Sequence, residues 1–123
     1  MSNYVYYNRN PKHDIKEDCV CRAISTATGL EYNTIANLLS WTSAIYNCDK
    51  LNVDCYCGLL NDVFKFRYYV CYDGENALYI ARCFPNSKLI IRVEGHLTCS
   101  ICGEISDIWD CSKEIVDKFW IVE

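Results

Sequence analysis

The stretch that decides the fold reads Asp18-Cys19-Val20-Cys21-Arg22-Ala23-Ile24-Ser25-Thr26-Ala27-Thr28-Gly29. Four apolar residues in it recur at the spacing of one helix face: Val20, Ala23, Ile24 and Ala27. The stretch therefore predicts a helix over residues 18–28 that packs one face on a core. Asp18 is the candidate N-cap, and Gly29 is the candidate residue for ending the helix. Cys19 then lies in the first helical turn.

The sequence on either side of this helix predicts an α+β domain. Further helices are expected over residues 33–46 with Asn33 as the cap, over 54–63, and over 75–83 before Pro85. Strands are expected over residues 4–7 at an edge, and over 66–71, 88–93, 96–101, 104–109 and 118–122. Helices first and mostly antiparallel strands later is the α+β arrangement.

Length and charge limit the classes of function. The chain has 123 residues, which is the size of one domain spanning 1–123, and 51% of them are hydrophobic. No apolar run approaches the roughly 20 residues of a membrane helix. Twelve basic against sixteen acidic residues give a net charge of −4, which argues against a non-specific nucleic-acid binder. The expected partner is a protein or peptide, with no nucleic acid and no membrane.

Ten cysteines are unusual for a chain of this length. The N-terminus has no basic region, apolar segment or small-residue cleavage site of the kind that marks a signal peptide. We therefore expect a cytoplasmic protein with free thiols, because disulfides form mainly in oxidising compartments. Most of these cysteines stand in apolar surroundings, where a free thiol behaves as a small buried hydrophobe.

The predicted hairpin about Cys102-Gly103 brings a histidine and an acid together. In the simplest register, the residue numbers of each cross-strand pair add up to 205, so that His96 faces Trp109. Asp107 then lies on the same face as His96, as a diagonal neighbour roughly 7–8 Å away between backbones. A three-residue loop would select Asp110 instead. The simplest register therefore predicts a His96–Asp107 pair, with Trp109 shielding it from water.

Cys19 is the best thiol to serve as a nucleophile for this pair. The first turn of a helix favours a thiolate, because the macrodipole and free amides stabilise negative charge. The neighbouring acids Glu17 and Asp18 oppose this effect, but an imidazolium at His96 could outweigh them. Asp18 can also pair with Arg22, four residues on along the helix.

The chain resembles the papain-like cysteine peptidase superfamily, which has the same chain order of Cys, His and Asp. Within it, the chain is similar to a group of small phage and prophage-type proteins. The similarity spans nearly the whole chain and rests on Asn8-Arg9-Asn10-Pro11, Asp18-Cys19-Val20-Cys21-Arg22-Ala23-Ile24, Ala27-Thr28-Gly29, Gly95-His96-Leu97 and Asp107-Ile108-Trp109-Asp110. The resemblance implies a minimal papain-like domain, with the nucleophile helix first and a mostly antiparallel sheet after it.

The expected function is therefore acyl transfer: hydrolysis of a peptide or isopeptide bond, deamidation or transamidation. Cys19 would be the nucleophile, His96 the base and later the acid, and Asp107 the group that orients the imidazole. The sequence departs from the family in its oxyanion donor, because it contains no glutamine and carries His13 at that spacing. Asn8 or Asn10 could donate instead, together with the Cys19 backbone N–H.

Other functions compete with this one. Cys99 and Cys102 form one CxxC with His96 three residues before it, but a structural zinc site usually needs two such knuckles. A thioredoxin-type redox pair would precede a helix, and this one does not. We therefore expect no metal and no cofactor. The serious alternative is a catalytically inactive papain-like module that binds or inhibits a host protein, since a fold does not fix a function.

Overall fold

The computed structural model describes residues 3–12, 18–49 and 52–123. Its helices are α1 (Cys19–Thr28), α2 (Tyr32–Tyr46), α3 (Val53–Gly58), one turn of π-helix η1 (Leu59–Val63), and α4 (Ala77–Cys83). Its strands are β1 (Tyr4–Tyr6), β2 (Arg67–Val70), β3 (Lys88–Val93), β4 (His96–Ile101), β5 (Glu104–Asp107) and β6 (Val116–Val122). These elements form the α+β fold that the sequence predicts.

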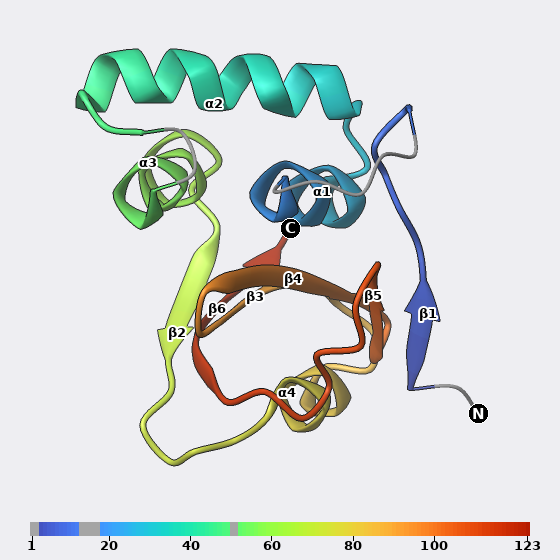
Figure 1. The fold of residues 1–123 in the computed structure, drawn as a ribbon. Coiled ribbons are helices and arrows are strands. Elements are labelled where there is room, and N and C mark those ends of the chain that lie inside the picture. Colours follow the sequence, from blue (N-terminus) through green and yellow to red (C-terminus); the bar gives the residue numbers. More distant parts are fainter. Residues whose placement is uncertain (1–2, 13–17, 50–51) are drawn as a thin grey trace.

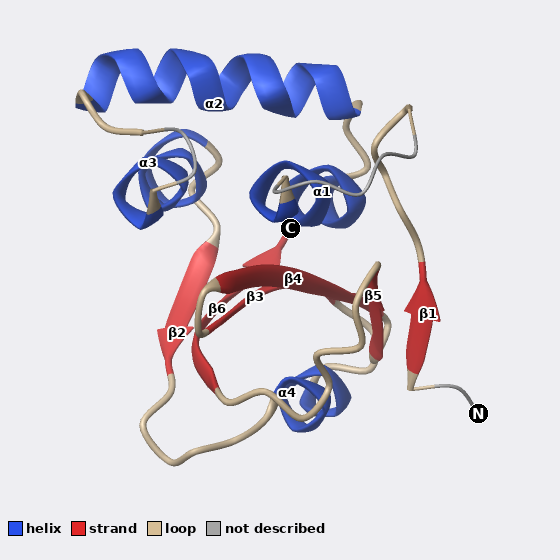
Figure 2. Cartoon of the chain, in the orientation of Figure 1, coloured by secondary structure: helices blue, strands red, loops and turns tan. Residues whose placement is uncertain are grey.

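The strands form one mixed sheet in the order β1-β5-β4-β3-β6-β2. β1 runs parallel to β5, and all the other neighbouring pairs are antiparallel. Helices α1, α2 and α3 lie on one side of the sheet, and α4 lies on the other (Figures 1 and 2). The predicted edge strand at the N-terminus is confirmed, because β1 is the outermost strand.

The branched residues of β3 explain why both sheet faces are covered. Ile90 belongs to the core beneath α1, α2 and α3, whereas Leu89 and Ile91 belong to the core around α4. Side chains alternate between faces along a strand, so a run of apolar residues supplies both cores at once. All three side chains are fully buried. This double burial makes β3 a central strand.

The hairpin carries the predicted register next to its turn. Ser100 pairs with Ile105 and Ile101 pairs with Glu104, which matches the expected sum of 205. Cys102 and Gly103 both have a positive φ, of 50° and 86°, as a two-residue type I′ turn requires. β5 ends at residue 107, two residues earlier than predicted, so the expected strand pairing of His96 with Trp109 does not form.

The helices differ from the prediction mainly at their ends. α1 and the end of α2 match, but α2 begins at Tyr32, so Asn33 is not its cap. Asn52 caps α3, its side chain accepting a hydrogen bond from the Asp54 N–H at 2.8 Å. The single helix expected over residues 54–63 is divided into α3 and a π-helical turn. None of the described helices has the length and apolar character that crossing a membrane requires.

Replacing Gly29 with alanine is expected to lower the free energy of unfolding by about 1 kcal/mol. Gly29 has φ +77°, and its N–H donates to the Ser25 carbonyl at 2.9 Å, which ends α1. The added Cβ meets no other atom, so backbone strain alone carries the effect. Chemical denaturation measures it. Asn37→Ala, at an exposed helical position of α2, is the control and should be neutral or slightly stabilising.

Candidate active site

Three element ends meet at one place in the fold. Cys19 is the first residue of α1, His96 the first residue of β4, and Asp107 the last residue of β5. The short turn between β4 and β5 brings His96 and Asp107 into reach, and α1 packs across β4. The structure therefore brings together the three residues that the sequence singled out for catalysis.

His96 and Asp107 form a short, largely buried hydrogen bond. The His96 Nε2 lies 2.7 Å from the Asp107 Oδ2, and the Ile108 N–H donates to the other carboxylate oxygen at 2.7 Å. Asp110 accepts instead from the Ser112 N–H and hydroxyl, at 3.1 and 2.5 Å. Of the two acids that the register could have selected, Asp107 is the partner of the histidine.

The N-terminal segment that contains β1 holds the backbone of Asp107 in place. The Tyr4 hydroxyl and the Tyr7 N–H each donate to the Asp107 carbonyl oxygen at 2.9 Å. Tyr6 is the register partner of Asp107 in the parallel pair. The acid is therefore held by an edge strand that comes from the opposite end of the chain.

The Cys19 thiol and the His96 imidazole shift each other's pKa. Burial raises the pKa of the Cys19 thiol, but the imidazole of His96, with its charge, and the Leu97 backbone N–H outweigh burial and lower that pKa. Burial lowers the pKa of His96, but hydrogen bonds to Asp107, Cys111 and Cys19 outweigh it and raise that pKa well above 6.5. Opposite shifts of this kind favour a thiolate paired with an imidazolium.

The pKa of Asp107 is lowered although the carboxylate is buried. Burial raises it, but the hydrogen bond from His96, the neighbouring Thr98, the charge on the His96 ring and the Ile108 N–H together outweigh burial. Trp109 lies beside the same imidazole, with ring centroids 5.0 Å apart and planes at 75°. The tryptophan is 45% exposed, so it covers one edge of the pair and still faces solvent. Its position beside His96 matches the prediction, but it follows the end of β5.

Asp18 and Arg22 form a buried ion pair that supports the site. Asp18 occupies the N-cap position of α1 without a side-chain cap bond, which differs from the predicted capping role. Its carboxylate binds the Arg22 guanidinium and accepts from the Tyr32 hydroxyl at 2.6 Å. The Arg22 Nη2 also lies 3.8 Å from the Asp107 Oδ1. One buried cation thus joins the first turn of α1 to the acid that orients His96.

The two asparagines expected near the oxyanion take another position. The Asn10 amide donates to the Asp18 carboxylate at 3.1 Å, and the Asn8 side-chain oxygen accepts from the Asn10 N–H at 3.0 Å. Both are buried, and they border a cavity of about 300 Å³ that Cys19 does not line. The structure gives Asn10 a role in holding Asp18. The other residues considered in this region, His13 and Glu17, lie outside the described residues.

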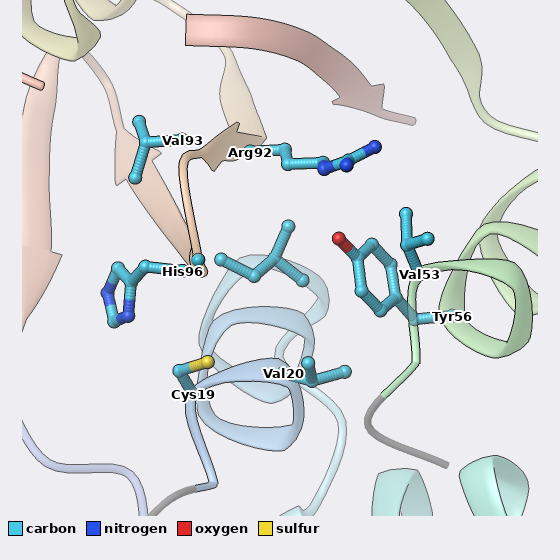
Figure 3. Close-up of a pocket in the computed structure, with 9 residues that line it drawn as sticks. Cys19, Val20, Val53, Tyr56, Arg92, Val93 and His96 are labelled. Atoms are coloured by element: carbon cyan, nitrogen blue, oxygen red, sulfur yellow. The ribbon is translucent and has the colours of Figure 1, made fainter. Parts of the chain in front are cut away.

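A cavity of about 220 Å³ opens beside the thiol (Figure 3). Cys19 and His96 border it on one side, and α3 contributes Val53 and Tyr56 on the other (Figure 3). Arg92 of β3 borders the same space. Cys19 thus borders a small pocket, which has both apolar and polar walls.

One set of side chains in the described part of the chain could hold a metal ion: His96, Asp107 and Cys111. Their ligand atoms lie within 4.8 Å of one another. The set overlaps the His96–Asp107 pair, and the Arg22 cation at 3.8 Å from Asp107 disfavours a second cation there. The CxxC cysteines do not belong to it: Cys99 is buried and donates to the Ser106 carbonyl, whereas Cys102 is exposed at the turn.

Sequence reasoning missed three residues at the site: Cys111, Tyr56 and Arg92. Cys111 lies in an irregular segment, with its sulfur 3.9 Å from the Asp107 Oδ2. Tyr56 and Arg92 come from different elements, and neither stands in a motif.

Comparisons with family models, with curated proteins and with solved structures found no match to this chain.

Proposed function

We propose that this chain is a cysteine-dependent acyl-transfer enzyme with a papain-like arrangement of nucleophile helix and sheet. The observation that carries the proposal is that Cys19 and His96 border one pocket while His96 is hydrogen-bonded to Asp107. The three groups come from three element ends, and the thiol and the imidazole shift each other's pKa. A nucleophile, a base and a group that orients the base are the parts that acyl transfer through a covalent intermediate requires.

In the proposed reaction the Cys19 thiolate attacks the carbonyl carbon of an amide and forms a tetrahedral intermediate. His96, protonated at the nitrogen that faces Cys19, donates that proton to the leaving nitrogen as the C–N bond breaks. A thioester on Cys19 and a free amine result. His96 then takes a proton from water, whose oxygen attacks the thioester and releases a carboxylic acid and the Cys19 thiolate, which restores the thiolate–imidazolium pair. An amine in place of water gives transamidation.

The surroundings of the triad favour this chemistry. Asp107 binds Nε2, which leaves the other ring nitrogen for proton transfer and fixes the ring orientation. Cys19 begins a ten-residue helix, so the helix macrodipole also stabilises the thiolate. The Cys19 backbone N–H, which has no intrahelical partner in the first turn, is a candidate donor to the oxyanion.

Labelling at low pH tests the proposal. At pH 6, iodoacetamide is expected to alkylate Cys19 at least about tenfold faster than any other thiol, because the lowered pKa gives Cys19 a larger thiolate fraction than an ordinary thiol has. Peptide mass spectrometry at short times measures the rates. Cys83 and Cys102 are exposed and serve as internal references.

Faster labelling of either exposed reference thiol at pH 6 would contradict the proposal, because exposure alone would then govern reactivity. The Cys19→Ser variant distinguishes the proposed enzyme from an inactive binding module. This change should abolish any acyl-transfer activity and leave the circular dichroism spectrum unchanged, whereas a binding protein should keep its biological effect in the same variant.

A further inference from the structure

We propose that the pocket beside Cys19 binds a carboxylate of the substrate, held by Arg92 and Tyr56. This inference rests on the proposed function and adds a substrate class to it: a peptide with an acidic side chain next to the reacting bond. It follows from where the polar groups of the pocket lie and from what else they bind.

Arg92 supplies the charge. It is the register partner of Leu97 in β4, and both residues border the pocket. The Arg92 Nε lies 3.5 Å from the Asp117 Oδ2, and the Asp117 side chain is 52% exposed. In the described residues no other ion pair of Arg92 is found, so both terminal guanidinium nitrogens remain for an anion. A guanidinium binds a carboxylate through two parallel hydrogen bonds when both of these nitrogens are accessible.

Lys118 adds a second positive charge close by. It is the register partner of Arg92 on β6, and its Nζ lies over the rings of Tyr68 and Trp120, at 4.8 and 5.6 Å from their centroids. These contacts hold the ammonium over two aromatic rings of β2 and β6. Asp54 and the half-exposed Asp117 lie near the two cations, so the positive charge that an anion meets in the pocket is chiefly that of Arg92, which borders the pocket itself.

Tyr56 supplies a neutral donor. Its ring is buried and packs edge-on against Trp120, with centroids 6.2 Å apart and planes at 71°. Its hydroxyl points into the pocket on the side of Arg92 (Figure 3). Burial raises the pKa of Tyr56, so the hydroxyl keeps its proton and can donate it to an acceptor.

The rest of the pocket is apolar and small. Val20, Val53 and Leu97 line it between Cys19 and the two polar groups. A volume of about 220 Å³ admits one side chain of moderate size. An aspartate or glutamate fits this shape, because its methylene groups would contact the apolar wall while its carboxylate reaches Arg92.

Two matched alkylating probes test the inference: N-iodoacetylglycine, which carries a carboxylate, and its neutral amide, N-iodoacetylglycinamide. The measured quantity is the ratio of their alkylation rates at Cys19. Arg92→Gln is expected to lower this ratio by about five- to tenfold, the effect of losing one charge-assisted contact at a partly exposed site. Tyr56→Phe should lower it about twofold, and Arg92→Lys should retain most of it.

Arg67→Gln is the matched control, because it makes the same change in net charge at an exposed ion pair with Glu123. It should leave the ratio unchanged. Equal ratios in the wild type, Arg92→Gln and Tyr56→Phe would overturn the carboxylate site, while fast labelling by the neutral probe would still support the proposed enzyme. Slow labelling of Cys19 by both probes would instead overturn the proposed function on which the inference rests.

Discussion

Replacing Arg22 with methionine is expected to lower the free energy of unfolding by about 3–5 kcal/mol. The Arg22 guanidinium is buried and bound to Asp18, and it lies 3.8 Å from the Asp107 Oδ1. Without it, two buried carboxylates lose their shared cation and have little access to water. Removing one partner of a buried ion pair costs much more than the pair contributes, because the remaining charge stays desolvated. Urea denaturation followed by circular dichroism measures the loss.

The matched control is Arg67→Met, which removes the same charge from a pair that is more than half exposed. It should cost less than about 1 kcal/mol. A second variant, Arg22→Met combined with Asp18→Asn, should recover part of the stability, because one of the uncompensated charges is gone. A loss below 1 kcal/mol in Arg22→Met alone would show that this ion pair does not support the fold.

Replacing His96 with glutamine is expected to slow alkylation of Cys19 at pH 6 by about 10- to 100-fold. His96 is the largest influence that lowers the pKa of Cys19. Without the imidazole the thiol pKa rises, although the Leu97 N–H and the Arg22 charge still lower it, so that less thiolate is present at pH 6. At pH 9.5 the two proteins should differ much less, because the thiol ionises in both. Rates of iodoacetamide labelling across this pH range measure the change.

The exposed thiol of Cys83 provides the internal control, since it lies on α4 on the other side of the sheet and its rate should be the same in both proteins. Equal labelling of Cys19 at pH 6 with and without the imidazole would mean that His96 does not activate the thiol. Such a result would remove the main support for catalysis and favour the binding module.

Much of the fold could be predicted from local patterns in the sequence. The i, i+3, i+4, i+7 spacing after Asp18 and the glycine at 29 define α1, because both signals lie within the helix itself. The bounds of β3 and β4 match because a run of branched residues and a Gly95 turn mark them. The Cys102-Gly103 turn set the hairpin register, and the register placed Asp107 on the His96 face.

The surroundings of the site depended on tertiary structure. The sequence suggested Asn10 as an oxyanion donor, but folding directs its amide to Asp18. Arg92 and Tyr56 meet at the pocket only because α3 packs near the ends of β3 and β4. Cys111 lies near His96 and Asp107 in an irregular segment. The sequence there has no helix or strand periodicity from which this position could have been predicted.

Local patterns in the sequence were enough to predict the approximate positions of the helices, the central strands β3 and β4, and the order Cys19, His96, Asp107 of the candidate site. These depend on periodicity and turn chemistry, which act between residues a few positions apart. Which polar groups surround Cys19, His96 and Asp107 depended on the tertiary structure. Those contacts join residues far apart in the chain, such as Tyr4 with Asp107, and burial in the folded core determines which partners each polar group can reach.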